Sequence, residues 1–430
     1  MAQPLHLTDR KMRKLLQINP VLRTNTSTGR IMQEIGELAM QNGWESHIAY
    51  SYGRDGILPC KSHTVPVGDR WSVAWHGIAT RLADRHGLAS AGATRRFVRR
   101  IEAIRPDIIH IHNIHGYFLN YRILFDYLSG IDTPVVWTVH DCWLYTGHCF
   151  YYSYAGCGKW QTGCGDCPQR REFPASWLVD RSQRNHTDKR EAFTSVPAGR
   201  MVIVPVSEWI KSEMERSFLR GYDMRVIHNG INTETFRLFD AEPVKDRYHL
   251  KGRHILLGVA SVWSREKGLD DFIRLSGMLN DNEVIVLVGV DRNTRSRLPK
   301  NIVGIGRTEN IHQLAELYSA ATAFVNPTWQ DNYPTVNLEA IACGTPVVTY
   351  RTGGSVEAVT EATGYIVGQG DLCGIIRAVR AIESRGKESF REPCRNYALA
   401  HFRKEDRYAD YLRLYDGMVY WNRQVMPGLH

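Results

Sequence analysis

The chain has 430 residues, of which 43% are hydrophobic and 23% are charged, and its formal net charge is +9. This length favours two domains rather than one core, and the composition is that of a globular protein. Because the sequence has no run of about 18 apolar residues and no apolar segment near its start, it predicts neither a membrane-spanning helix nor a secretory signal. Residues 1–11 are predicted to be a polar leader before Met12. The positive charge suits an anionic ligand, an anionic membrane surface or nucleic acid, and equally an ordinary basic protein.

Short apolar runs alternate with helical patterns along the chain. The run at 14–19 is followed by a small-residue loop at 24–29 and a helix pattern from about 30 to 41. The other strands of this first series are predicted at 45–51, 106–113, 134–141 and 201–207. The strands of a second series are predicted at 254–260, 283–289, 301–306, 323–328 and 346–351. Strands that alternate with helices indicate parallel sheets, so two such series, divided near 230–250, predict two doubly wound α/β domains.

The stretch 331–348, DNYPTVNLEAIACGTPVV, carries two acids separated by seven residues, Asp331 and Glu339. Pro334 suits the first turn of a helix and Gly344 suits the position after its end, so Glu339 is predicted in the second turn. In doubly wound sheets, ligands bind beyond the carboxyl ends of the strands. Since this helix follows a predicted strand, its N-terminus is expected to open on that crevice.

A phosphate site is predicted at the same place. Asn332 is a plausible N-cap, and the N-terminus of a helix attracts phosphate through free N–H groups and its dipole. The next turn, RTGGSVEAV, repeats the pattern: Gly353 and Gly354 allow close backbone approach, and a new helix is expected from Ser355. The carboxylates would repel phosphate, so we expect them to accept hydrogen bonds from sugar hydroxyls. A diphosphate that carries sugars at both ends is a nucleotide sugar.

These motifs resemble those of the retaining glycosyltransferases of family 4, which have the two-domain GT-B fold. The family signature of an acid, seven residues and a Glu, then a small-residue segment and a paired-glycine turn, reads here as Asp331, Glu339, ACGTPVV and TGGSVEAV. Segment 226–236 resembles the family's interdomain segment, 261–273 its phosphate-contacting lysine loop and 137–141 the strand end that brings a His to the donor sugar. The first acid is usually Glu in the family and is Asp here, in a DNYP context similar to the subgroup that builds exopolysaccharides such as colanic acid.

The resemblance implies two Rossmann-like domains that face each other across a cleft. Residues 12–231 would form the acceptor-side domain, with the C-terminal helix 405–430 packing back on it, and residues 232–404 would bind the nucleotide-sugar donor. The implied activity is a metal-independent, retaining hexosyl transfer from a UDP- or GDP-linked sugar to a glycan or lipid-linked acceptor in bacterial polysaccharide biosynthesis. The predicted location is the cytoplasm, with peripheral contact at the inner face of the membrane expected if segments 69–87 and 94–105 dock on a bilayer.

The resemblance also implies roles for individual residues. Lys267 and Arg265 would stabilise the leaving diphosphate, while Asp331 and His140 would contact the transferred sugar. Arg265 is equally well interpreted as a surface charge, and a structural histidine is the weaker of the two interpretations of His140. The other expected donor contacts are Glu339 on the ribose, with Gly353, Gly354, Asn332, Tyr333, Pro334 and Thr335. The residues expected to line the cleft are Gly29, His112 and Asn113.

The histidine-rich segment HIHNIHG at 110–116 has part of the H-x-H-x-D-H spacing of a dinuclear metallohydrolase. The required Asp position holds Ile114, and no later motif completes such a set, so the metal interpretation is disfavoured. Three other functions remain open. A nucleotide-sugar epimerase of the same architecture would form product from the donor alone, and a non-catalytic sugar-nucleotide or glycan-binding protein would bind without turnover. A nucleic-acid binder is disfavoured because aromatic residues are not interleaved with the basic ones.

Two further regions carry hypotheses of their own. Segments 69–87 and 94–105 are basic and amphipathic, which fits either a solvated helix pair or docking on an anionic bilayer. Cys164 and Cys167 have the C-x-x-C spacing of a metal site, and Cys149 and Cys157 could complete a tetrahedron for a structural zinc ion. Unligated buried thiols and a disulfide pair are the alternatives for these four residues.

Overall fold

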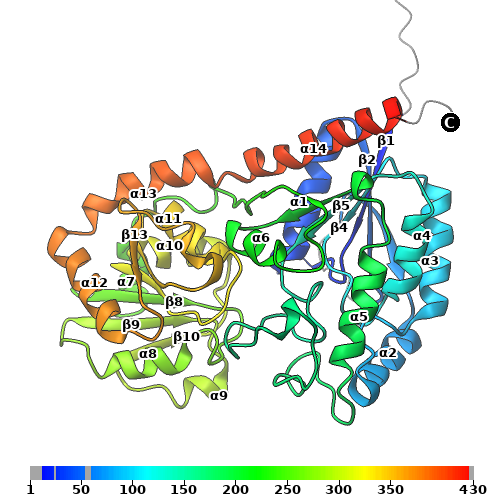
Figure 1. Ribbon diagram of the computed structural model, residues 1–430. Coiled ribbons are helices and arrows are strands. Elements are labelled where there is room, and N and C mark those ends of the chain that lie inside the picture. The colour runs from blue at the N-terminus through cyan, green and yellow to red at the C-terminus, as the bar shows by residue number, and fades with distance from the viewer. Residues whose placement is uncertain (1–11, 24–25, 54–59, 426–430) are drawn as a thin grey trace, which may run out of the picture.

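The computed structural model describes residues 12–23, 26–53 and 60–425. Two sheets stand side by side, each covered by helices, and every pair of neighbouring strands is parallel (Figure 1). The predicted fold class, two doubly wound α/β domains, is confirmed. The predicted leader at 1–11 and the end of the predicted C-terminal helix, 426–430, lie outside the described residues. Within them, no helix is both long and apolar enough to cross a bilayer.

The N-terminal sheet has seven strands in the order β3-β2-β1-β4-β5-β6-β7. Its strands are β1 (Arg13–Ile18), β2 (Trp44–Ser51), β3 (His63–Val67), β4 (Ile108–Ile111), β5 (Val135–Val139), β6 (Met201–Pro205) and β7 (Asp223–Met224). Its helices are α1 (Ser27–Gln41), α2 (Arg70–Ala83), α3 (Ala91–Ile104), α4 (Tyr121–Ser129), α5 (Ser182–Phe193) and α6 (Glu208–Met214). Every residue of β5 and β6 is buried, as expected of central strands in a parallel sheet. The edge strands β3 and β7 are additions to the predicted series, and α1 begins three residues before the predicted start at Arg30.

The C-terminal sheet has six strands in the order β10-β9-β8-β11-β12-β13. They are β8 (His254–Val259), β9 (Glu283–Val288), β10 (Ile302–Ile305), β11 (Ala323–Asn326), β12 (Val347–Tyr350) and β13 (Gly364–Val367). The helices are α7 (Glu242–Arg247), α8 (Leu269–Ser276), α9 (Arg292–Arg295), α10 (Ile311–Ala320), α11 (Thr335–Ala342), α12 (Leu372–Arg385) and α13 (Glu388–His401). The order reverses direction between β8 and β11, which is where doubly wound sheets bind ligands.

The last helix, α14 (Lys404–Val425), leaves the C-terminal domain and crosses to the N-terminal one, along the upper side of the molecule in Figure 1. The Lys404 ammonium lies 2.8 Å from Glu34 on α1, and the Tyr415 hydroxyl lies 2.6 Å from Nδ1 of His110 on β4. Tyr415 is fully buried, so α14 is part of the N-terminal core rather than a loose tail. The helix therefore fixes one edge of the interface between the domains.

Candidate functional site

A cleft of about 290 Å³ lies between the two domains and is lined by both of them. The predicted site residues that line it are His140, Lys267, Asp331, Asn332, Tyr333, Pro334 and Thr335. His140 follows the end of β5, Lys267 follows β8, and the others lie after β11, up to Thr335 at the start of α11. All therefore come from the carboxyl ends of parallel strands, as the fold requires.

The contact between Lys267 and Asp331 is the main charged feature of this cleft. The Lys267 ammonium donates to Oδ2 of Asp331 at 2.6 Å, with the carboxylate side chain mostly buried. Gly268 sets the position of this lysine: its φ is 77°, and a Cβ there would stand 2.4 Å from the carbonyl oxygen of Pro327. The Trp329 N–H also donates to the Glu266 carbonyl at 2.8 Å, so the lysine loop is joined directly to the segment that carries Asp331.

The paired glycines, Gly353 and Gly354, pack against the turn that carries Asp331 instead of forming an open phosphate site. A Cβ on Gly353 would stand 2.0 Å from the Asp331 carbonyl oxygen, and one on Gly354 would stand 1.8 Å from that of Asn332. The Gly354 N–H donates to the Asp331 carbonyl at 3.3 Å. The predicted second helix from Ser355 is wrong, because Gly353–Val356 forms a short 3₁₀ helix. The glycines are required by close backbone packing, and of the two helix N-termini predicted here only that of α11 contributes residues to the cleft lining.

Asn332 joins the two domains. Its side-chain amide donates to the His140 carbonyl at 2.6 Å, and its buried Oδ1 has no hydrogen-bond partner among the described residues. The prediction that Asn332 is the N-cap of the helix is wrong: α11 begins at Thr335, and Pro334 occupies the N-cap position. The asparagine is instead held by a contact from the other domain, which no local sequence pattern encodes.

The ring of His140 belongs to a buried histidine pair. Its Nε2 lies 3.1 Å from Nδ1 of His112, whose Nε2 lies 3.1 Å from the side-chain oxygen of Gln17. Burial lowers the pKa of His140 to about 4, so the ring is neutral near pH 7. His112 and Asn113 line a second, small cavity with His140 rather than the main cleft. His140 thus stands between the two cavities.

Glu339 is buried beside the cleft but is not among the residues that line it. Its carboxylate accepts from the Tyr318 hydroxyl at 3.1 Å and lies 3.6 Å from the guanidinium of Arg30, which comes from the other domain. Burial raises the pKa of Glu339, and Arg30 opposes this effect. Glu339 follows Thr335 by one helical turn, so the two residues share a face of α11.

Two other predicted residues lie away from the cleft. The Arg265 side chain is 78% exposed and forms an ion pair with Asp270 at 3.3 Å, so its predicted place beside the diphosphate is not supported by its position. Gly29 lies in the first turn of α1, where a Cβ would stand 2.3 Å from the Arg23 carbonyl oxygen. Its neighbours Ser27 and Thr28 line the cleft instead.

The four cysteines of the 149–167 segment all border one small cavity, together with His148. They are free thiols, and the hydrogen bond from Cys149 lowers the pKa of Cys167 to about 7. The Gly147 N–H donates to the sulfur of Cys164 at 3.1 Å. Across the residues that the structure describes, no three His, Cys, Asp or Glu side chains form a group able to hold a metal ion. In this structure the four sulfur atoms do not form such a group, and zinc binding by Cys149, Cys157, Cys164 and Cys167 stays a prediction.

The histidines of segment 110–116 are also engaged separately. His110 bonds to Thr138 and Tyr415, and His115 lies 2.8 Å from the Asp141 carboxylate. His110 and His115 therefore each have hydrogen-bond partners of their own, and the metal interpretation stays disfavoured on the sequence alone.

Sequence reasoning missed several residues of the site. The additional polar and aromatic residues that line the cleft include Tyr151, Asn229, Ser261, Trp263 and Asn326. A second cross-domain contact was also missed: the Glu357 carboxylate accepts from the N–H groups of Glu208 and Trp209 at 2.9 and 2.8 Å and so caps α6 of the other domain. Ser261 and Trp263 lie in the recognised lysine loop and Glu357 lies in the recognised TGGSVEAV turn, so the segment itself was a signal for these residues. Tyr151 had no such signal.

Comparisons with known proteins agree with this geometry. The profile described as Glycosyltransferase Family 4 matches residues 28–235, and the one described as Glycosyl transferases group 1 matches residues 253–384. A protein named as a colanic acid biosynthesis glycosyl transferase, WcaC of Escherichia coli (strain K12), is 24% identical over 381 residues, covering 84% of this chain and 89% of that protein.

Solved structures show the same fold at low sequence identity. Sucrose-phosphate synthase from Thermosynechococcus elongatus superposes with a TM-score of 0.69 at 16% identity, covering 94% of this chain and 99% of that one. Anabaena HepE in complex with UDP gives 0.65 at 13% identity, covering 94% and 100%. These superpositions identify the architecture as the GT-B fold. With both domains matched by family profiles, the chain belongs to the family 4 glycosyltransferases.

Proposed function

We propose that this glycosyltransferase moves a hexosyl group, with retention of anomeric configuration, from a UDP- or GDP-linked sugar to a glycan or lipid-linked acceptor. The single observation that supports this most is the cleft itself. It brings Lys267 and Asp331 from the C-terminal domain together with His140 from the N-terminal domain. These groups suit a nucleotide sugar. The cation of Lys267 can bind the diphosphate, and the carboxylate of Asp331 and the neutral imidazole of His140 can bind sugar hydroxyls. The similarity to WcaC supports a role in polysaccharide biosynthesis.

In the proposed reaction, the bond between the anomeric carbon and the diphosphate oxygen breaks and its electron pair stays on the diphosphate. Lys267 and the N-terminus of α11 stabilise that growing negative charge. The acceptor hydroxyl forms the new bond on the face from which the diphosphate leaves, and its proton passes to the leaving phosphate oxygen. His140 and Asp331 hold the transferred sugar through its hydroxyl groups.

Glu339 is assigned to the ribose hydroxyls of the donor. It shares a helix face with Thr335, which lines the cleft, and it lies one turn deeper. Arg30 now lies 3.6 Å from its carboxylate, so the ribose would replace or join that contact when the donor binds. Because Lys267 and the helix N-terminus supply positive charge, the proposed transfer needs no divalent cation.

The donor is tested first by a thermal-shift series of UDP- and GDP-linked sugars on the full chain. We expect one nucleotide sugar to raise the unfolding temperature in the presence of EDTA, and lack of any shift across the series would contradict donor binding. The reaction is then followed with that donor and a set of glycan acceptors. Proton NMR of the new glycoside should give the anomeric configuration of the donor, whereas inversion, or conversion of the donor alone, would refute retaining transfer.

A further inference from the structure

Helix α2 turns its apolar side chains away from the protein. Four large residues, between 44% and 70% exposed, form what we call the α2 stripe: Trp71, Trp75, Ile78 and Leu82. Since each helical residue turns by about 100°, these positions fall within an arc of roughly 60°. The opposite side of the helix, with His76, Gly77 and Thr80, is the buried one. An ordinary surface helix has the reverse arrangement.

The buried side of α2 is fixed by specific hydrogen bonds. The ring of His76 lies 2.9 Å from the Ser90 hydroxyl through Nδ1 and accepts from the Gly87 N–H at 2.9 Å through Nε2. The N-terminus is capped by the Asp69 side chain, which accepts from the N–H groups of Trp71 and Ser72. These contacts set the rotation of the helix, so the outward position of the α2 stripe is part of the fold.

A second exposed apolar segment adjoins the stripe. Its four large residues, between 45% and 70% exposed, are Phe173, Trp177, Leu178 and Val179. The Trp177 N–H donates to the Arg81 carbonyl on α2 at 2.7 Å, and the Arg81 guanidinium lies 5.8 Å from the Trp177 ring. We call the stripe and this segment together the apolar face. It holds eight of the seventeen large hydrophobic residues that are exposed in the described part of the chain. Isolated exposed apolar residues are normal, but a cluster of this kind marks an interaction surface.

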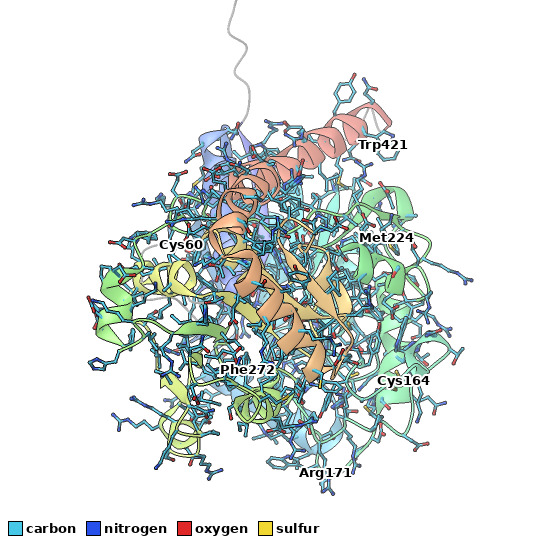
Figure 2. All side chains as sticks on the ribbon, turned by 90° about the vertical axis from the view of Figure 1, so that its left-hand side faces the viewer. Cys60, Cys164, Arg171, Met224, Phe272 and Trp421 are labelled. Atoms are coloured by element: carbon cyan, nitrogen blue, oxygen red, sulfur yellow. The ribbon has the colours of Figure 1, made fainter. Side chains whose placement is uncertain are left out.

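Arginines adjoin the apolar face: the Arg70 guanidinium lies 4.6 Å from the Trp71 ring, and Arg96 pairs at 3.4 Å with Asp69, which caps α2. Residues 69–105 contain eight arginines against three acidic residues. The arginines of this span that are exposed are Arg70, Arg85, Arg95, Arg96, Arg99, Arg100 and Arg105. Figure 1 shows α2 at the lower end of the N-terminal domain, and Figure 2 shows the exposed Arg171 at that same end. The surface therefore combines tryptophan and leucine with a strong excess of positive charge.

We propose that the apolar face docks the N-terminal domain on an anionic lipid bilayer. Tryptophan side chains favour the boundary between water and acyl chains, and arginines can reach lipid phosphates while their apolar stems stay at the interface. One amphipathic surface with a basic rim supplies the two contributions, apolar burial and charge, that stable peripheral binding needs. The proposal deepens the proposed function, because a lipid-linked acceptor would then be presented to the domain that receives it.

The test uses co-sedimentation of the full chain with phosphatidylglycerol-containing vesicles and with phosphatidylcholine vesicles. We expect binding to the anionic vesicles that weakens as salt is raised. The double variant Trp71→Ser/Trp75→Ser should bind roughly tenfold more weakly or worse. Trp421→Ser is the matched control, since Trp421 is 48% exposed on α14 at the opposite end of the molecule (Figure 2), and it should bind like the wild type. The variant Arg99→Gln/Arg100→Gln should reduce the salt dependence.

Equal binding to both kinds of vesicle, or wild-type binding by the Trp71→Ser/Trp75→Ser variant, would overturn the proposal. So would a concentration-dependent dimer in analytical ultracentrifugation that the same variant dissociates, because the face would then belong to a second copy. Thermal unfolding checks that the variant is folded. Nucleotide-sugar binding in solution is measured in parallel: it should be unchanged in the variant, and its failure in the wild type would refute the proposed donor while leaving the vesicle result intact.

Discussion

Lys267 and Asp331 illustrate how one residue contact prepares the site. In this structure the lysine charge is balanced by the carboxylate at 2.6 Å. An incoming diphosphate would compete for that lysine because it carries more negative charge than the carboxylate. Asp331 would then be released to accept a hydrogen bond from a sugar hydroxyl. A single ion pair can therefore couple donor binding to the orientation of the transferred sugar.

This interpretation predicts different effects for two neighbouring cations. Lys267→Ala should lower kcat by about 10²–10³-fold and affect KM for the donor less, because the leaving charge grows in the transition state. Arg265→Ala should keep near wild-type kcat, since that side chain is 78% exposed and pairs with Asp270. Steady-state kinetics of the two variants distinguishes these roles. Equal losses in both, or none in Lys267→Ala, would contradict the assignment of the lysine.

Glu339 gives a second prediction at this scale. Glu339→Gln should weaken donor binding by about 1.5–3 kcal/mol, because a buried sugar hydroxyl loses a charged acceptor. Arg30→Gln is the control that keeps the carboxylate and removes its 3.6 Å partner. It should retain donor binding. Titration calorimetry with the nucleotide sugar measures the donor affinity of both variants. Equal losses of affinity would mean that Glu339 acts only through its contact with Arg30 in the other domain.

At the scale of elements, the conformation of the turn before α11 is set by backbone packing more than by side-chain contacts. The short 3₁₀ helix Gly353–Val356 lies against the carbonyl groups of Asp331 and Asn332. The buried side chain of Asn337 strengthens this junction, since its amide donates to the Ser355 carbonyl at 3.0 Å. The position of the cleft-lining residues thus follows from how two loops fit together.

The prediction for this junction compares a substitution at Gly354 with a control substitution at Gly417. Gly354→Ala would place a Cβ 1.8 Å from the Asn332 carbonyl oxygen, so the turn must move, at a cost of about 1–3 kcal/mol in stability and with loss of donor binding. Gly417→Ala on α14 is the matched control: nothing lies within 4 Å of its Cβ, and it should be neutral or stabilising by about 0.5–1 kcal/mol. Urea unfolding and thermal shift with the donor measure both effects. Wild-type stability and affinity in Gly354→Ala would show that the turn tolerates a side chain.

For the whole molecule, the domains are joined by α14 and by contacts across the interface. Three of these contacts are Asn332 to the His140 carbonyl, Glu357 to the N-terminus of α6, and Arg30 to Glu339. Two of the three are made to the backbone of the N-terminal domain, so they do not depend on the side-chain rotamers of that domain. The cleft is consequently a property of the assembled pair of domains.

Buried neutral histidines make this assembly sensitive to acid. His76 accepts a backbone N–H through Nε2, and burial lowers its pKa to about 3. The unfolded chain therefore binds the proton first, and stability falls as the pH drops from about 6.5 toward 3. At about pH 5 the loss from this residue is about 2 kcal/mol. His76→Gln, in which an amide oxygen can accept the same N–H, should reduce the difference in unfolding free energy between neutral and acid pH by about that amount.

The control for the acid effect is His63→Gln, because His63 is exposed at the edge strand β3. This variant should show the pH dependence of the wild type in urea unfolding. If His76→Gln followed the wild-type curve as well, His76 would not be one of the groups that cause acid destabilisation.

The sequence by itself determined the fold class and the central strands, because a strand buried on both faces needs a continuous apolar run that can be read locally. It also determined the turn that carries Asp331 and the loop that carries Lys267. It determined the end of α11 as well, where Gly344 adopts a φ of 72°. Motifs of this kind depend on the conformation of a few adjacent residues. Edge strands such as β3, β7 and β13 were missed because they are short and owe their existence to pairing with a neighbour.

Only the tertiary structure decided which of these residues meet. It brought Arg30 to Glu339 and Asn332 to the His140 carbonyl, placed the four cysteines around one small cavity, and left Arg265 in solvent. It also turned the apolar side of α2 outward, although periodicity alone would have placed that side against the core. The physical reason is the same in each case. Helical or strand period is a local property of the chain, whereas a side chain's partner depends on segments far away in the sequence.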